Sequence, residues 1–121
     1  MARRPAKMSP EARSWYLARL EYIAERNPVA ARKFQAMIMK ARRHLADFPR
    51  IGQTGLIPGT RRLVVGPYIL TVRRRDGAVE IGAIRHARQG DAYEPKELLE
   101  EGMDQDDTED LSEDDTSEWR M

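Results

Sequence analysis

The sequence has no cysteine and no long apolar run, which excludes thiol chemistry and a membrane-spanning helix. Without thiols it cannot form disulfides, a thiolate metal site or a cysteine nucleophile, so a reducing cytoplasm is the natural setting. No apolar stretch approaches the roughly 20 residues of a membrane helix, and no apolar segment follows the basic start of the chain as in a secretory signal. We therefore expect a soluble cytoplasmic protein with one domain in its 121 residues.

Histidine is also scarce. The two histidines, His44 and His86, fall in a predicted helix and a predicted strand, far apart in the sequence. This arrangement gives no spacing typical of metal ligands. We expect neither a metal nor another cofactor.

Acidic residues are sparse in the first three quarters of the chain. Residues 1–90 hold 19 Lys and Arg against 6 Asp and Glu, whereas residues 91–121 hold 2 against 14. The formal net charge of +1 therefore combines a body of +13 with a tail of −12. Such a body favours an acidic partner, either nucleic acid or an acidic protein segment, and the tail can compete for the same surface.

Capping signals and apolar periodicity predict two helices in the first half of the chain. Ser9 suits an N-cap and is followed by proline at the first helical position, and Asn27-Pro28 ends one helix and starts the next. Apolar residues recur at spacings of three and four until Pro49. We expect a tight helical hairpin, preceded at Arg3–Met8 by at most an irregular edge strand.

The pattern changes after an ordered loop at residues 50–60, which is rich in glycine and proline. Three segments rich in β-branched residues follow, separated by Gly66-Pro67 and by the hairpin signal Asp76-Gly77: Arg62–Val65, Tyr68–Arg74 and Ala78–Arg85. We predict an α+β domain over residues 1–93, in which the helical hairpin packs on a small, mostly antiparallel sheet of three to four strands.

Residues 94–121 are predicted to form an acidic and largely disordered tail. A short helix is expected at residues 95–101, ended by Gly102, and Trp119 could act as an anchor further on. Three interpretations of the tail stay open. It is a solubilising segment, an intramolecular mimic of an acidic partner that contacts the basic sheet, or an addition foreign to the natural protein.

Several segments in the body resemble the ParE branch of the RelE/ParE toxins over roughly Ser9 to Asp91. That family typically has a leading strand, a helical hairpin, a Pro-x-x-Gly loop, a Gly-x-Tyr motif where a strand begins and a His/Arg strand end. The matching segments are Ser9-Pro10-Glu11-Ala12, Pro49-Arg50-Ile51-Gly52, Arg62-Leu63-Val64-Val65-Gly66-Pro67-Tyr68 and Ile81-Gly82-Ala83-Ile84-Arg85-His86-Ala87-Arg88. The acidic tail has no counterpart in this pattern.

The resemblance implies the toxin of a type II toxin–antitoxin pair, neutralised by a cognate antitoxin that covers the helical hairpin and the sheet. ParE-like members act against DNA gyrase without a known catalytic centre, whereas RelE-like members cleave mRNA on the ribosome. The nuclease alternative would use Arg62, Arg73, His86 and Tyr93. Ile69 stands where such nucleases usually carry an arginine, which favours the gyrase interpretation. A third alternative is a binding module of the same fold without toxic activity.

The candidate partner-binding residues are the cations near the strand ends: Arg61, Arg62, Arg73, Arg75, Arg85, His86 and Arg88. Strand alternation places Arg73 and Arg75 on one face of the sheet and Arg74 on the other. In the simpler interpretation the arginines are solvated charges and the histidine is structural. A nucleic-acid surface would add stacking aromatics, for which only Tyr68 and Tyr93 are near.

The charge asymmetry predicts that the acidic tail weakens partner binding. If Asp104 to Glu118 lies transiently over the arginine-rich sheet, deleting residues 102–121 strengthens partner binding at low salt, and the gain fades as salt screens the charges. Titration of full-length and shortened protein against the antitoxin at two salt concentrations measures the effect. Equal affinities at low salt would show that the tail does not mask the partner surface.

Overall fold

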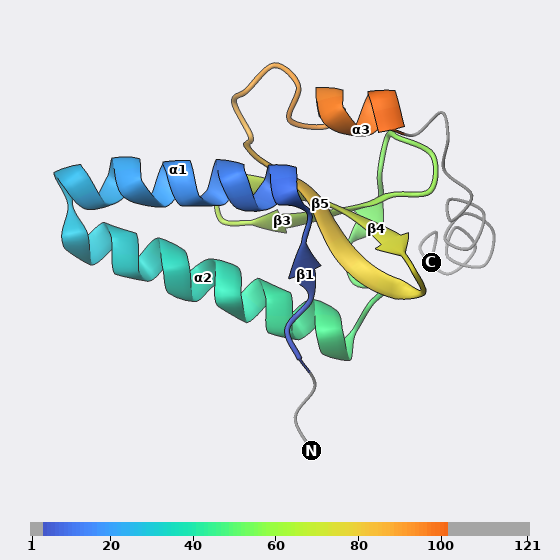
Figure 1. Ribbon diagram of the computed structural model, residues 1–121, viewed down its shortest axis with the longest axis horizontal. Coiled ribbons are helices and arrows are strands. Elements are labelled where there is room, and N and C mark those ends of the chain that lie inside the picture. The colour runs from blue at the N-terminus through green and yellow to red at the C-terminus, as the bar shows by residue number, and fades with distance from the viewer. Residues whose placement is uncertain (1–3, 102–121) are drawn as a thin grey trace.

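A helical hairpin covers one face of a five-stranded sheet, and a short helix covers part of the other (Figure 1). This computed structural model describes residues 4–101. The elements in chain order are β1 (Lys7–Met8), α1 (Pro10–Arg26), α2 (Pro28–Asp47), β2 (Gln53–Thr54), β3 (Arg61–Val65), β4 (Tyr68–Arg75), β5 (Ala78–His86) and α3 (Lys96–Glu101). The strand order is β1-β5-β4-β3-β2, with β1 parallel to β5 and the other pairs antiparallel.

The capping residues place the helices where the sequence predicts them. The Ser9 hydroxyl accepts a hydrogen bond from the Ala12 backbone N–H at 3.0 Å. Asn27 serves both helices, because its backbone N–H donates to the Ile23 carbonyl at the end of α1 and its Oδ1 accepts from the Ala30 N–H in α2. One residue thus satisfies groups at two helix ends, which explains the tight hairpin.

The three long strands are confirmed, each extended by one residue relative to the prediction. The turn between β4 and β5 has the expected hairpin geometry. Asp76 and Gly77 both adopt positive φ, at 53° and 78°. Successive left-handed residues are what a type I′ turn requires, and they match the twist of the paired strands.

The predicted number of strands was too low, since the sheet has five strands rather than three or four. The expected edge strand at the N-terminus forms at Lys7–Met8, whereas Gln53–Thr54 lies inside the segment predicted as a loop. β2 pairs only with Arg61 and Arg62 of β3. A strand of two residues is too short to show a periodic pattern in the sequence. Its position is set by its pairing with the neighbouring strand, which the local sequence does not reveal.

The main core lies between the sheet and the helical hairpin, on what we call the hairpin face. Tyr16 of α1 and Phe34, Ile38 and Leu45 of α2 pack there against the sheet. The buried residues that the strands contribute to this cluster are Tyr68, Leu70, Val72, Ile81 and Ile84. The amphipathic periodicity of the helices therefore predicts the correct buried side.

The opposite face of the sheet, which we call the α3 face, carries a smaller core of Ile57, Ala83 and Leu98. Leu98 belongs to α3, which was expected within the tail, and it is only 3% exposed. Residues 102–121 lie outside the described part of the chain. The predicted disorder, the end of the short helix at Gly102, the anchor at Trp119 and the contact of the tail with the sheet all fall there.

Ser9 joins the first helix to the centre of the sheet. Its hydroxyl donates to the Gly82 carbonyl and its backbone N–H donates to the Ile81 carbonyl, both at 2.9 Å. Gly82 is the extra residue of a β-bulge, because Thr71 pairs with Ala83 while Val72 pairs with Ile81. Ser9 is completely buried. Ser9 thus attaches the start of α1 to Gly82 in the bulge, 73 positions further along the chain.

We expect Ser9→Ala to lower the free energy of unfolding by about 1–3 kcal/mol. The substitution removes an N-cap and leaves the buried Gly82 carbonyl without its hydroxyl donor. Urea denaturation followed by circular dichroism measures the change. Ser14→Ala is the control, because Ser14 is exposed within the same helix. Equal stability of the two variants would contradict a structural role for the Ser9 hydroxyl.

Candidate partner-binding site

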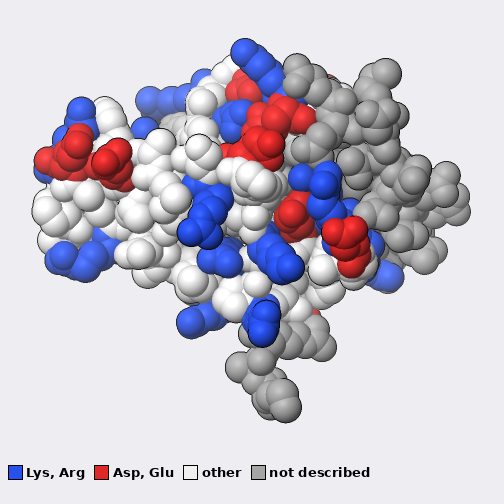
Figure 2. Space-filling view, viewed as in Figure 1, with Lys and Arg blue, Asp and Glu red and all other residues white. Residues whose placement is uncertain are grey.

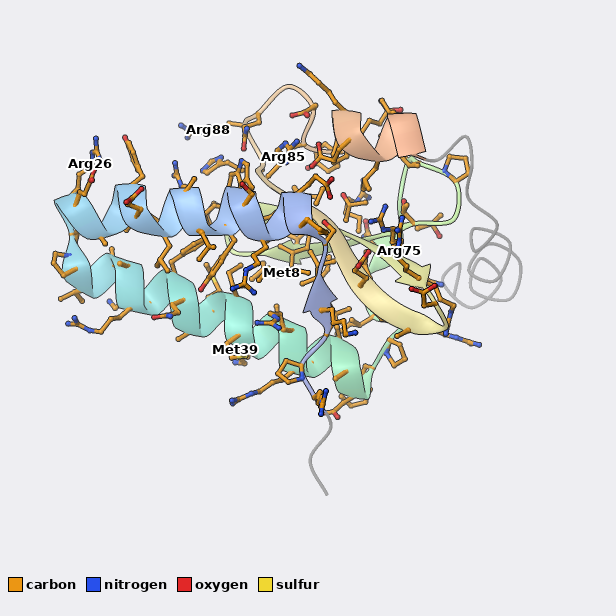
Figure 3. The ribbon with its side chains drawn as sticks, viewed as in Figure 1. Met8, Arg26, Met39, Arg75, Arg85 and Arg88 are labelled. Carbon is orange, nitrogen blue, oxygen red and sulfur yellow. The ribbon has the colours of Figure 1, made fainter. Side chains whose placement is uncertain are left out.

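The sheet divides the predicted site residues between its two faces. Alternation from Leu63 and Ile84, which pack in the main core, places Arg61 and His86 on the hairpin face. The remaining predicted strand residues, Arg62, Arg73, Arg75 and Arg85, lie on the α3 face. Arg85 and Arg75 lie at opposite ends of the β4–β5 hairpin (Figure 3). The predicted residues therefore do not form one continuous surface.

Glu80 neutralises charge on the α3 face. It lies opposite Arg73 in the register of β4 and β5. The Arg73 Nη2 and the Glu80 Oε1 are 2.9 Å apart, and the Arg75 Nε lies 3.6 Å from the same oxygen. The predicted sharing of one face by Arg73 and Arg75 is confirmed, whereas the Arg74 guanidinium donates to the Gly77 carbonyl. Arg73 is only 7% exposed, so it offers a partner little surface.

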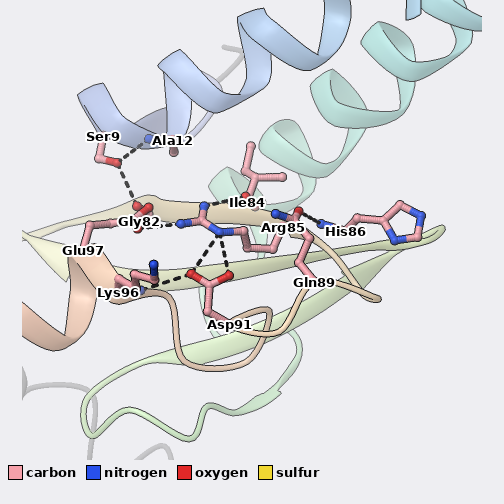
Figure 4. A network of polar contacts seen from close by, with 10 residues as sticks. All are labelled: Ser9, Ala12, Gly82, Ile84, Arg85, His86, Gln89, Asp91, Lys96 and Glu97. Carbon is pink, nitrogen blue, oxygen red and sulfur yellow. Dashed lines mark hydrogen bonds and ion pairs between the residues drawn. The ribbon is translucent and has the colours of Figure 1, made fainter. Parts of the chain in front are cut away.

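Arg85 is held by two carboxylates that follow it in the chain (Figure 4). Its Nε donates to Asp91 at 3.2 Å and its Nη2 donates to Glu97 of α3 at 2.6 Å. Partial burial opposes the charged forms of both Arg85 and Asp91. The hydrogen bonds outweigh burial, so the pKa of Arg85 is raised and the pKa of Asp91 is lowered. This cluster ties α3 to the end of β5.

Two other predicted arginines have different surroundings. The Arg62 guanidinium carbon lies 5.1 Å from the centre of the Tyr93 ring, and its Nη2 donates to the Gln53 side chain. Tyr93 is 40% exposed, so this cation–π pair is accessible to a partner. Arg61 is only 2% exposed. It therefore presents almost no surface for binding.

His86 packs against Tyr68 and has one ring nitrogen engaged. The two rings meet edge to face, with their centres 5.5 Å apart. The Nδ1 of His86 accepts a hydrogen bond from the Arg88 backbone N–H at 3.1 Å, and the His86 backbone N–H donates to the Gln89 side chain. With Nδ1 as an acceptor, a neutral imidazole carries its proton on Nε2. These contacts give His86 a structural position at the end of β5.

The side chains around Tyr68 form a hollow of about 320 Å³, which we call the Tyr68 hollow. The Arg19 Nε donates to the Tyr68 hydroxyl at 3.3 Å. The residues lining the hollow are Trp15, Ala18, Arg19, Tyr22, His86 and Gln89. A second hollow, of about 260 Å³, lies between the helical hairpin and the β3–β4 turn, and Tyr68 belongs to its lining. Aromatic edges and guanidinium groups thus meet beside a buried tyrosine.

The hollow was not predicted from the sequence, although the residues of α1 that line it follow a recognisable pattern. Trp15, Arg19 and Tyr22 are four and three residues apart, so they lie along one side of α1. Arg26 extends the row, with its guanidinium carbon 3.6 Å from the centre of the Tyr22 ring. Tyr22 is 49% exposed rather than part of the core. Such a row of aromatic and cationic groups suits an acidic segment that also carries apolar side chains.

Comparisons with known proteins match the basic body of the chain to toxins of toxin–antitoxin systems. Residues 7–90 match the model of the ParE toxin of the type II toxin–antitoxin system parDE. Toxin RelE2 of Caulobacter vibrioides is 33% identical over 67 residues, which cover 55% of this chain and 76% of that protein. The protein Y4kP of Sinorhizobium fredii is 42% identical over 71 residues, which cover 56% of this chain and 72% of that protein.

The fold also has a counterpart among solved structures. A structure of a chromosomal ParDE toxin–antitoxin system from P. aeruginosa superposes with a TM-score of 0.60 and 20% sequence identity. The superposition covers 68% of this chain and 94% of the other. None of the described helices is long and apolar enough to cross a membrane.

We expect Asp91→Asn to lower the free energy of unfolding by about 1.5–3 kcal/mol at pH 7, because it removes charged hydrogen bonds to Arg85. The folded-state pKa of Asp91 is lowered, so its contribution is complete above the unfolded pKa of about 3.9 and disappears as pH falls through the folded pKa. Denaturant titrations of both proteins between pH 2 and pH 7 test this. Glu94→Gln is the control, since Glu94 is an exposed neighbour. A difference that is the same at every pH would contradict the assigned cause.

Proposed function

Because the chain belongs to the ParE toxin family of type II toxin–antitoxin systems, we propose that it inhibits DNA gyrase and that a cognate antitoxin neutralises it. Inhibition of gyrase blocks replication, so the free toxin arrests growth. The proposed site of action is the cytoplasm. The alternative is a ribosome-dependent endoribonuclease of the RelE type. A nuclease requires its polar side chains to meet around one phosphate, whereas a gyrase inhibitor requires them only to contact another protein.

The four candidate nuclease residues lie on different faces of the sheet, and this separation favours the gyrase proposal. Arg62 and Arg73 lie on the α3 face with Tyr93 beside Arg62, whereas His86 packs against Tyr68 on the hairpin face. A general acid or base must lie within hydrogen-bond reach of the atom it protonates or deprotonates. One phosphodiester cannot contact side chains on both faces of a sheet at once, which supports an action without a catalytic centre.

The ion pairs on the α3 face support the same choice. A nuclease stabilises the charge of its transition state with cations directed at the phosphate. Glu80 already engages Arg73, while Asp91 and Glu97 engage Arg85. Ile69, on the same face, supplies no charge where RelE-like nucleases usually have arginine. These groups act as structural ion pairs in the proposed function.

We assign separate surfaces to the two proposed partners. The Tyr68 hollow and the helical hairpin accept an antitoxin segment with acidic and apolar residues, since aromatic rings and guanidinium groups meet there. The α3 face and the loop after β5 contact gyrase. Support for this second assignment comes from the exposed Arg88 in that loop and from the accessible Arg62–Tyr93 pair.

Two assays with purified components test the target. We expect the protein to inhibit DNA supercoiling by gyrase and to leave mRNA intact in a ribosome-based translation reaction. Tyr93→Phe should inhibit gyrase to the same extent, because the variant keeps the ring that Arg62 stacks on and removes only the hydroxyl. Ribosome-dependent mRNA cleavage that disappears in Tyr93→Phe would instead establish the nuclease alternative.

A further inference from the structure

A row of cations runs along the exposed side of α2, apart from the Tyr68 hollow and the α3 face. α2 belongs to the helical hairpin that the antitoxin is proposed to cover. Arg32, Lys33, Lys40 and Arg43 are all exposed. At 3.6 residues per turn, these four positions fall within about a third of the helix circumference. From Arg32 to Arg43 there are eleven residue steps, or about 16 Å along the helix axis. We call these four residues the α2 stripe.

The α2 stripe differs from the cations of the sheet because its charges are not neutralised locally. Among residues 4–101, none of its four side chains forms an ion pair or a hydrogen bond with another residue. Asp47, in the last turn, is the only acidic residue of α2. Figure 2 shows basic side chains over α2 and the N-terminal segment in the lower part of the view, while most acidic side chains lie elsewhere.

Arg42 adds a further cation to this side of the molecule by holding the N-terminal segment. The Ala6 backbone N–H donates to the Arg42 carbonyl at 2.9 Å, and the Arg42 Nε donates to the Ala6 carbonyl at 2.8 Å. Arg4 is exposed and only two residues from this contact. Arg42 thus anchors the segment to α2, and Arg4 flanks the α2 stripe.

We infer that the α2 stripe binds the phosphate backbone of double-stranded nucleic acid, independently of sequence. A length of about 16 Å matches about five base pairs at 3.4 Å each. Between Arg32 and Arg43 the aromatic residue is Phe34, which is buried in the core. The exposed rings of His44 and Phe48 follow Arg43 and pack edge to face on each other, so no ring lies among the four cations for stacking on unpaired bases. Cations without stacking groups favour a duplex over a single strand.

Charge density favours a duplex over an acidic polypeptide as the occupant. A DNA duplex carries one negative charge per roughly 1.7 Å of its axis. Residues 102–121 carry nine Asp and Glu, and 20 residues have a contour length of about 70 Å, so their charges are spaced about 8 Å apart along the chain. The duplex therefore places more charges within reach of the stripe. This inference does not rest on the proposed gyrase target, because it concerns nucleic acid alone.

Fluorescence anisotropy of a labelled 20-base-pair DNA duplex with the full-length protein tests the inference across a range of salt concentrations. In the variant Arg32→Gln, Lys40→Gln, Arg43→Gln, the slope of log affinity against log salt should fall in magnitude by about 3, because each neutralised phosphate accounts for roughly 0.9 of that slope. Affinity at low salt should fall at least about tenfold. The matched control is Arg13→Gln, Arg88→Gln, Lys96→Gln, which removes three exposed charges elsewhere and should bind nearly as the natural protein does.

Three outcomes would overturn the inference. The stripe variant could bind the duplex as tightly as the natural protein, or the control variant could lose as much affinity, which would mean that only bulk charge matters. Polyglutamate at equal charge concentration could displace the duplex, which would identify acidic polypeptides as the favoured ligand. Circular dichroism and thermal unfolding of each variant confirm that altered binding does not reflect loss of fold.

Discussion

The buried contact between Ser9 and Gly82 is the constraint on which the arrangement of the layers depends. It attaches the start of α1 to the bulge in β5, and Asn27 then turns the chain directly into α2. The helical hairpin is therefore held over one face of the sheet. On the other side of the bulge, a side chain added at Gly82 would meet Leu98 at 3.1 Å and Arg73 at 3.3 Å. Glycine at this position thus lets α3 pack closely on the opposite face.

Charge is distributed in two different ways in the basic body. Arginines on the α3 face are matched by carboxylates, Glu80 for Arg73 and Asp91 with Glu97 for Arg85. Partly buried cations of this kind need such partners because desolvation is costly. Cations on the solvent side of α2 remain hydrated and need none. The surplus of positive charge is therefore most available on α2, away from the strands that supplied the predicted site.

The distribution of charged residues fits a toxin that acts by binding better than one that acts by catalysis. A nuclease needs several polar groups directed at one phosphate, whereas a protein inhibitor needs surfaces shaped for another protein. His86 takes part in aromatic packing with Tyr68, and Arg85 holds α3 against the sheet. Both residues make contacts within the fold, and His86 also lines the Tyr68 hollow. Accessible features among residues 4–101 include this hollow, the Arg62–Tyr93 pair and the α2 stripe.

Local signals in the sequence suffice to predict the helical hairpin, the three long strands and the turn at Asp76-Gly77, because caps, turn residues and periodicity act over a few neighbouring residues. The face of the sheet that each charged residue occupies depends instead on the folded chain. Alternation counted from Ile81 would place Arg85 on the hairpin face, but the bulge at Gly82 shifts the count and moves Arg85 to the α3 face. The carboxylate of Glu97, twelve residues further on, then meets it there. Such contacts depend on strand register and on packing between distant segments, which local patterns do not encode.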